Sequence, residues 1–157
     1  MYKATVRWMI RRNIAALNAG DHAPALKMFA DDLEFSFPGD NSWATEFRPL
    51  ERGRHAHVTH RGRAEMARFL ERFVAAGIQM EVEDILVNGP PWNMRAAVRC
   101  HVWSPGPLGD RYTNRAILYV TSSWGRLRTQ EDYEDTERSA AFDAVLAGVT
   151  SAARPGV

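Results

Sequence analysis

The sequence predicts one α+β domain in which helices come first and antiparallel strands follow. Apolar residues recur at helical spacing before residue 30 and again between residues 63 and 77. From residue 78 onward, apolar and polar residues alternate in stretches separated by turn sequences. A length of 157 residues, of which 45% are hydrophobic, suits one domain with one core.

The N-terminal third predicts two helices and a strand. The first helix is expected from Thr5 to Ala19, before Gly20, and Asp21 is expected to cap a short second helix. A strand then follows from Leu33, in which large apolar residues alternate with polar ones until a Pro-Gly pair ends it.

The rest of the chain predicts a helix, an antiparallel meander and a final helix. Met66 opens an apolar stripe in a helix that ends at Gly77, and Thr136 can cap the last helix. We expect one domain over 1–149, a loop insertion over 38–61 and a flexible tail over 150–157. The four expected strands are 78–88, 94–103, 111–121 and 126–135.

Charge and cysteine content limit the partners. The net charge of +1 offers no overall field for nucleic acid or an anionic membrane, so neither is expected as a partner. Cys100 is the only cysteine, which excludes an internal disulfide and favours a cytoplasmic location. The N-terminal segment lacks the continuous apolar stretch of a signal peptide or a membrane span.

One polar residue interrupts the apolar stripe of the first helix. Asn13 stands at helical spacing with Val6, Ile10 and Leu17. An amide on an inward stripe is unfavourable for packing unless the interior needs a hydrogen-bonding group. The position of Asn13 therefore predicts a cavity.

Several short motifs fall in the order typical of one superfamily. The chain resembles the SnoaL-like and nuclear-transport-factor-2-like proteins, which include ketosteroid isomerases and limonene epoxide hydrolases. The resemblance implies a cystatin-like, cone-shaped antiparallel sheet curved around the N-terminal helices, with a pocket inside. The motifs are Asn18-Ala19-Gly20-Asp21, Phe37-Pro38-Gly39, Arg61-Gly62-Arg63, Tyr112-Thr113-Asn114 and Asp132-Tyr133-Glu134-Asp135-Thr136.

The same resemblance implies a catalytic group of three residues. The strand 94–103 is similar to the one that carries Arg-x-Asp in limonene epoxide hydrolases, so Arg99 matches the arginine and His101 replaces the aspartate. Asp132 matches the carboxylate of the last strand. Arg99 would orient Asp132, and His101 could exchange a proton near neutral pH. The alternative is a cross-sheet ion pair of Arg99 and Asp132 without catalysis.

This assignment conflicts with the pattern of strand 94–103. Its apolar set would ordinarily face inward, whereas the resemblance turns the polar set, with Arg99 and His101, toward the cavity. Both can hold if the apolar set is buried against a second subunit, so we expect a homodimer formed through the convex sheet face. The apolar set is Met94, Ala96, Val98, Cys100 and Val102.

The chain departs from both enzyme patterns. Phe35 and Phe37 stand where epoxide hydrolases hold the attacking water. The base, the tyrosine and the aspartate of the ketosteroid isomerase pattern fall at Phe37, at Asn13 and near Ile117 or Leu118. Steroid isomerisation by that mechanism is therefore not expected, and the two phenylalanines are expected to form an apolar wall.

The insertion 38–61 mixes aromatic and cationic residues. Trp43 and His60 could close over a ligand, and His55, His57 and His60 have a spacing that can supply metal ligands. Exposed loop histidines are more often solvated, so no metal is expected.

These observations favour a cofactor-independent enzyme that acts on an apolar, oxygenated small molecule by hydrolysis, isomerisation, cyclisation or dehydration. The alternative is a non-catalytic ligand-binding or protein-interaction module. The catalytic candidates are Asp132, His101 and Arg99, and the ligand-binding candidates are Asn13, Phe35, Phe37, Trp43, His60, Asn114, Leu118 and Gln130.

Overall fold

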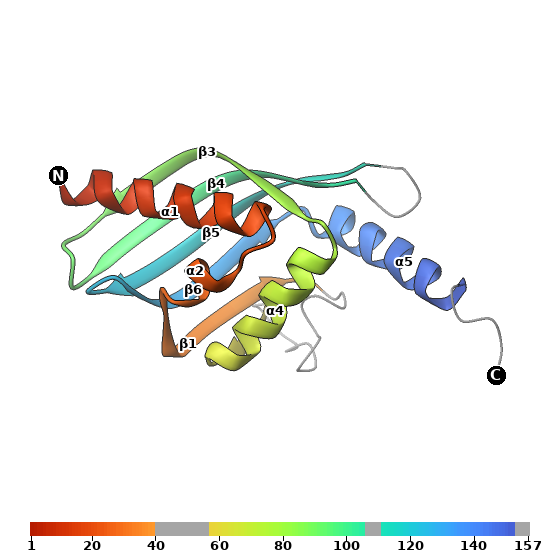
Figure 1. Ribbon diagram of the computed structural model, residues 1–157, viewed down its shortest axis with the longest axis horizontal. Helices are drawn as coiled ribbons and strands as arrows, with labels where there is room; N and C mark the ends of the chain where they lie inside the picture. The colour runs from red at the N-terminus through yellow and green to blue at the C-terminus, as the bar shows by residue number, and fades with distance from the viewer. Residues whose placement is uncertain (40–56, 106–110, 153–157) are drawn as a thin grey trace.

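The computed structural model describes residues 1–39, 57–105 and 111–152, which form an α+β fold (Figure 1). Helices α1 and α4 lie on one side of a curved sheet. The helices are α1 (Tyr2–Asn18), α2 (Ala23–Leu26), α4 (Arg63–Ala75) and α5 (Thr136–Ala152). The strands are β1 (Phe29–Pro38), β2 (His57–Arg61), β3 (Gln79–Asn88), β4 (Met94–Ser104), β5 (Tyr112–Ser123) and β6 (Arg126–Glu134).

The sheet has six strands in the order β2-β1-β6-β5-β4-β3. Strands β3 to β6 form the predicted antiparallel meander, in which each strand pairs with the next. Strand β1 pairs antiparallel with β2 and parallel with β6. The sheet is therefore mixed, and the first strand has the last strand of the sheet as one of its two partners.

The end of α1 is fastened to the sheet by one side chain. Asn18 donates from Nδ2 to the Met80 carbonyl at 2.8 Å and accepts from the Met80 amide through Oδ1 at 2.9 Å. These two bonds satisfy the backbone groups of an edge strand and hold α1 against β3. The chain then reverses at Gly20, whose φ of 86° is a left-handed conformation that glycine adopts readily.

Four boundaries differ from the sequence prediction by three residues or more, or by a whole element, and one of them is the strand expected from Leu33, which begins at Phe29. The helix expected from Thr5 begins at Tyr2, and residues 150–152, expected in the tail, belong to α5, which continues to Ala152. Residues 57–61, expected within a loop, form β2 against β1. The rest of the insertion, 40–56, and the last residues, 153–157, lie outside the described residues.

The core between the sheet and α4 is aromatic. Phe35 is buried, and its ring lies 5.0 Å from that of His60 and 6.2 Å from that of Phe69. Phe37 stacks on Phe69 with a centroid distance of 4.4 Å. These rings fix α4 on the sheet through burial of large apolar surfaces.

None of the described helices has both the length and the hydropathy needed to cross a bilayer.

Candidate functional site

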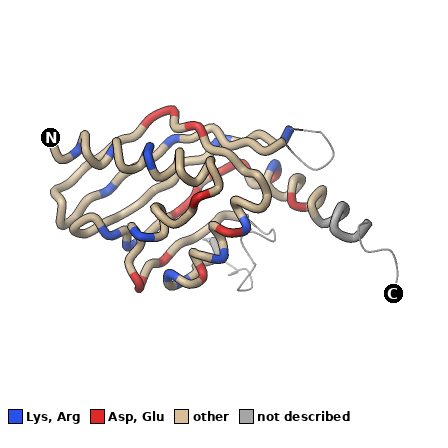
Figure 2. The backbone as a smooth tube through the Cα atoms, in the orientation of Figure 1, with Lys and Arg blue, Asp and Glu red and all other residues tan. Residues whose placement is uncertain are grey.

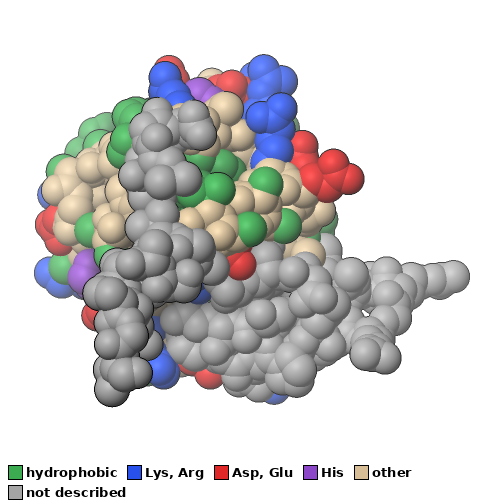
Figure 3. Space-filling model, turned by 90° about the vertical axis from the view of Figure 1, so that its right-hand side faces the viewer, with side chains coloured by type: hydrophobic (Ala, Val, Ile, Leu, Met, Phe, Trp, Pro, Cys, Tyr) green, Lys and Arg blue, Asp and Glu red, His purple; other side chains and the backbone are tan. Residues whose placement is uncertain are grey.

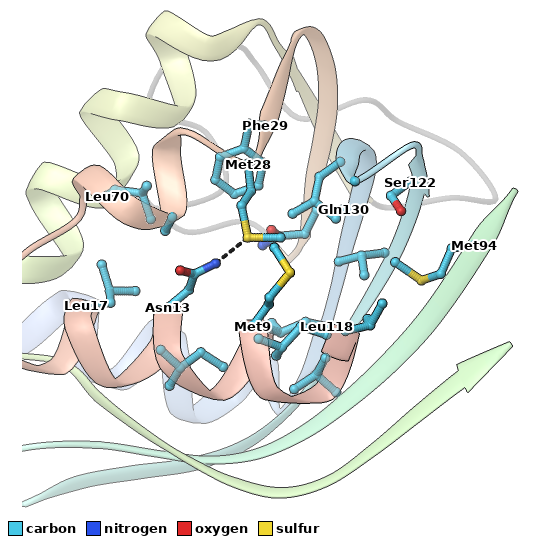
Figure 4. Close-up of a pocket in the computed structure, with 18 of the residues that line it drawn as sticks. Met9, Asn13, Leu17, Met28, Phe29, Leu70, Met94, Leu118, Ser122 and Gln130 are labelled. Carbon is cyan, nitrogen blue, oxygen red and sulfur yellow. Dashed lines mark hydrogen bonds between the residues drawn. The ribbon is translucent and has the colours of Figure 1, made fainter. Parts of the chain in front are cut away.

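A cavity of about 170 Å³ lies between α1, α4 and the inner face of the sheet. We use "inner face" for the side of the sheet that faces these helices and "outer face" for the other side. The cavity wall is mostly apolar, and methionine is frequent in it, as Figure 4 shows for Met9, Met28 and Met94. Its polar side chains are Asn13, Ser122, Gln130 and Asp132.

Asp132 is the acidic residue of the cavity wall among the described residues. It pairs in register with Leu118 of β5, which in turn pairs with Val98 of β4. Directly paired residues share a face of the sheet, so Asp132 faces inward with these two apolar residues, which also line the cavity.

Withdrawal from water changes the acidity of Asp132. Burial raises its pKa from the ordinary value of 3.8 to about 8, because the apolar surroundings disfavour the carboxylate. A 3.0 Å hydrogen bond from Gln130 Nε2 to Oδ1 opposes the increase, and the nearby Glu134 adds to it. Asp132 can therefore gain or lose a proton near neutral pH.

Asp132 also borders a second, smaller hollow of about 80 Å³. Glu134 lies on the same face of β6, two residues farther along, and burial raises its pKa as well. Tyr112 and Ser139 complete the polar part of this hollow. The inner face of β6 thus presents two carboxyl groups in succession.

A hydrogen-bond network closes this side of the hollow. The Nδ2 amide group of the buried Asn114 has three acceptors within hydrogen-bond distance for its two hydrogens: the Tyr112 hydroxyl at 3.0 Å, Ser139 Oγ at 3.1 Å and the Asp135 carbonyl at 3.0 Å. Its Oδ1 accepts from the Arg115 amide at 2.8 Å. Asn114 therefore joins β5 to the start of α5, and we assign it a structural role.

The structure separates the three residues expected to act together. Arg99 pairs in register with Ile117, one position away from the Val98–Leu118 pair, and so lies on the outer face. Its Nε lies 2.9 Å from Glu83 Oε2, and its side chain is 59% exposed. The predicted convergence of Arg99 with Asp132 is thus wrong, because the two point to opposite sides of the sheet.

His101 shares the outer face with Arg99. Its Nε2 lies 2.8 Å from Thr113 Oγ1, and it borders a polar surface hollow together with Glu83 and Arg138. The sheet separates His101 from the cavity that Asp132 lines, so it is not placed to exchange a proton with that carboxyl group.

The conflict that suggested a covered apolar face disappears with this placement. The apolar set of β4 lies on the inner face, where Met94 and Val98 line the cavity and Cys100 is fully buried. Burial raises the pKa of the Cys100 thiol to about 12, with Asp132 and Glu83 adding to the increase, so the thiol has no nucleophilic character. The β4 pattern therefore needs no second subunit.

Some of the other predicted ligand-binding residues line a cavity, and others lie in the core. Asn13, Leu118 and Gln130 line the main cavity, and Asn13 Nδ2 contacts the Met28 sulfur (Figure 4). Phe37 borders the smaller hollow.

Phe35 and His60 are buried in the core instead, with His60 Nδ1 3.6 Å from Glu65 Oε2. Trp43 and His55 lie outside the described residues. Among the residues that are described, no group of three His, Cys, Asp or Glu side chains could hold a metal ion.

Sequence reasoning did not single out Glu134, Tyr112 or Ser139. Glu134 could have been found from strand alternation, since it continues the series that begins with Gln130 and Asp132. Ser139 lies in α5, and no local pattern shows that it meets Asn114.

Comparisons with known proteins agree on the fold. The family model of the SnoaL-like domain matches residues 10–129. No curated protein matches the chain.

Solved structures match over most of the chain. Bal32a, from a soil-derived mobile gene cassette, has a TM-score of 0.63 at 16% identity, covering 87% of this chain and 95% of its own. AclR from Streptomyces galilaeus, provisionally assigned as a hydroxylase, has a TM-score of 0.63 at 17% identity, covering 98% and 89%. A provisionally assigned isomerase from Rhodopseudomonas palustris has a TM-score of 0.58 at 14% identity, covering 88% and 94%. At these identities the likeness shows the fold alone.

Proposed function

Because the chain belongs to the SnoaL-like domain family, we propose that it is a small-molecule enzyme that works by acid–base chemistry without a cofactor. This proposal rests on one observation: the carboxyl group of Asp132 lies in the wall of an apolar cavity, and its pKa is raised to about 8. A catalytic acid or base is most effective when its pKa lies near the working pH. The reaction class is hydrolysis, isomerisation, cyclisation or dehydration of an apolar, oxygenated compound.

Asp132 is the catalytic residue of this proposal. Gln130 holds Oδ1, so proton transfer is assigned to Oδ2. In its acid form Asp132 donates that proton to a substrate oxygen, and in its ionised form it removes one from carbon or oxygen. Gln130 is a positioning residue because it acts through Asp132, and Asn13 offers an amide to the substrate from the opposite wall.

Proton abstraction can be tested before the natural substrate is known. The protein is incubated in D₂O with a panel of enolisable cyclic ketones, and deuterium incorporation beside the carbonyl is followed by NMR. We expect Asp132→Asn to lower the exchange rate by about 10²-fold or more. Glu131→Gln is the matched control, since it removes a carboxylate from the outer face of the same strand and should leave the rate unchanged. Exchange that persists in Asp132→Asn would refute the role of Asp132.

One observation favours the alternative, a non-catalytic binding module. Arg99 and His101, the expected partners of Asp132, face away from the cavity. Saturable binding of apolar compounds with neither exchange nor turnover would support this second function.

Assembly and location complete the proposal. The outer face exposes Leu86, Ile117 and Tyr133, and we assign it as the surface through which a homodimer forms. Light scattering should give twice the chain mass, and Ile117→Asp should give the monomer mass. The unpaired Cys100 thiol is compatible with the reducing cytoplasm, where we place the protein.

A further inference from the structure

The main cavity reaches the surface at one end of the sheet. Pro91 of the β3–β4 turn and Gly125 of the β5–β6 turn line it, together with Tyr2 and Met9 of α1. Gly125 is exposed, and the other three are half-buried. Both turns lie at the end of the sheet that carries the N-terminus (Figure 1). We call this opening the mouth of the cavity.

Two tryptophans stand beside the mouth. Trp92 is 58% exposed and Trp124 is 72% exposed, and their ring centroids are 5.8 Å apart. The Trp124 amide donates to the Pro91 carbonyl at 2.8 Å, which joins the two turns. Trp124 has a φ of 50°, in the left-handed region where hairpin turns normally place asparagine or glycine. The chain thus keeps an indole in water at the rim of an apolar cavity.

Four segments supply most of the residues of the cavity wall, and the charged residues in these segments are all basic. Asp132 lies just after the last of them. Residues 1–20, 23–30, 85–98 and 117–130 contain no Asp or Glu. In Figure 2, Lys and Arg lie along α1 and at the turns of this end of the sheet. At the opposite end, both signs occur side by side (Figure 3). The basic residues of these segments are Lys3, Arg7, Arg11, Arg12, Lys27, Arg95, Arg126 and Arg128.

Arg126 is the cation that the structure fixes beside the mouth. It lies between two residues of the cavity wall, Gly125 and Leu127. Its Nη1 donates to the Lys27 carbonyl at 2.6 Å, and the next residue, Met28, also lines the cavity. The guanidinium group therefore joins the β5–β6 turn to the segment between α2 and β1, beside the cavity, and remains exposed.

The charge of Arg126 is available to a ligand. Arg128, two residues away, is neutralised by Asp32, with Nη1 2.6 Å from Oδ1. Within the described part of the chain, Arg126 has a carbonyl oxygen as its partner and no carboxylate. An Arg guanidinium has several donor groups, so one bond to a carbonyl leaves others for an anion.

Tyr2 supplies an unused hydrogen-bond donor in the same cavity. Its hydroxyl is buried and has no hydrogen-bond partner among the described residues. Buried polar groups normally have a partner, and one that lacks it while facing a cavity can be satisfied by a ligand.

We infer that the mouth binds the anionic head group of an amphiphile whose apolar body fills the cavity. The ligand class is a carboxylate, sulfate or phosphate attached to an apolar chain or ring system. An anion is costly to bury in an apolar interior that already contains Asp132, whereas Arg126 stabilises it at the surface. The apolar end of the molecule then extends toward Asp132, so this inference rests on the proposed function for the reaction at that end.

The test measures the binding of two probes of equal chain length, octanoate and octan-1-ol, by titration calorimetry. At about 0.01 M salt, where the Debye length is about 30 Å, we expect octanoate to bind the protein about tenfold more tightly than octan-1-ol. Arg126→Gln should abolish this preference, whereas Arg126→Lys, which keeps the positive charge, should retain part of it. Arg128→Gln is the matched control and should leave it unchanged. Tyr2→Phe should weaken octanoate binding about threefold, as expected for the loss of one hydrogen bond.

Salt provides a readout that needs no variant. Raising the salt to about 1 M, where the Debye length is about 3 Å, should remove most of the preference for octanoate. Equal affinities for both probes, unchanged by Arg126→Gln or by salt, would overturn the inference, and so would failure of both probes to bind.

The two proposals fail separately. The comparison of octanoate with octan-1-ol tests anion binding at the mouth and does not depend on catalysis. The exchange experiment with Asp132→Asn tests the chemistry and does not depend on anion binding.

Discussion

The two faces of the same strands show what the surrounding medium does to charged groups. On the outer face, Arg99 and Glu83 form an ion pair in contact with water. On the inner face, Asp132 lies in an apolar wall, and burial raises its pKa to about 8. Strand alternation alone decides which of these environments a residue meets. Chemistry near neutral pH is therefore expected on the inner face, and a substitution on the outer face is expected to cost the folded subunit less free energy of unfolding than one on the inner face.

The largest expected effect is the loss of stability when the packing of the inner face is disrupted. Phe35→Ala removes a ring that is 1% exposed and contacts the rings of His60 and Phe69. We expect the free energy of unfolding to fall by about 3–5 kcal/mol, measured by urea denaturation. Tyr133→Ala, made in the Ile117→Asp variant so that dimer formation does not contribute, removes an aromatic side chain that is 47% exposed on the outer face of β6, and should cost less than about 1 kcal/mol. Equal losses in the two variants would contradict the division into faces.

A second prediction uses the pH dependence of stability. Folding raises the pKa of Asp132 from 3.8 to about 8, so the folded protein binds this proton more tightly than the unfolded chain. Its contribution to stability is fully present below about pH 4 and is lost as the pH rises through about 8, at about 1.4 kcal/mol for each unit of pKa shift.

Asp132→Asn should flatten this part of the stability profile, because asparagine does not titrate. Urea midpoints measured at intervals between pH 4 and 9 give the comparison. The Asn variant should gain stability relative to the original protein as the pH rises. A constant difference across this range would show that the carboxyl group titrates as if in water.

The smallest effect concerns the outer ion pair. A double-mutant cycle with Arg99→Ala and Glu83→Ala should give a coupling energy below about 1 kcal/mol, since exposed ion pairs contribute little. Neither variant should change the affinity for octan-1-ol, because both groups lie outside the cavity. A loss of octan-1-ol binding in Arg99→Ala would show instead that Arg99 contributes to the ligand site.

Most of the fold follows from local sequence patterns. The period of two over residues 78–135 gave β3 to β6 within a few residues of their observed bounds, and Gly20 and Gly77 mark the ends of helices. Strand β2 was missed because Val58 is the only aliphatic residue between His57 and Arg61, so no alternation is visible. The parallel pairing of β1 with β6 joins distant segments and leaves no local signal.

The candidate site was predictable in part. Asp132 and Gln130 share strand parity, and Asn13 interrupts an apolar stripe, so the sequence alone directs these three toward the interior. Arg99 and His101 were misplaced because the match to a family motif was preferred over the alternation of β4 itself. A charged arginine is far more stable in water than in an apolar interior without a partner. The alternation of β4 therefore already predicted that Arg99 faces solvent.

The parallel pairing of β1 with β6 has a consequence for synthesis of the protein. Strand β1 leaves the ribosome early, yet the edge along which it pairs is supplied by residues Leu127 to Glu131. Until those residues emerge, the nascent β1–β2 hairpin exposes an unpaired edge and the apolar side of its aromatic residues. Truncation before β6 should therefore yield an aggregating product, and folding on the ribosome should be completed only after most of the chain has been made.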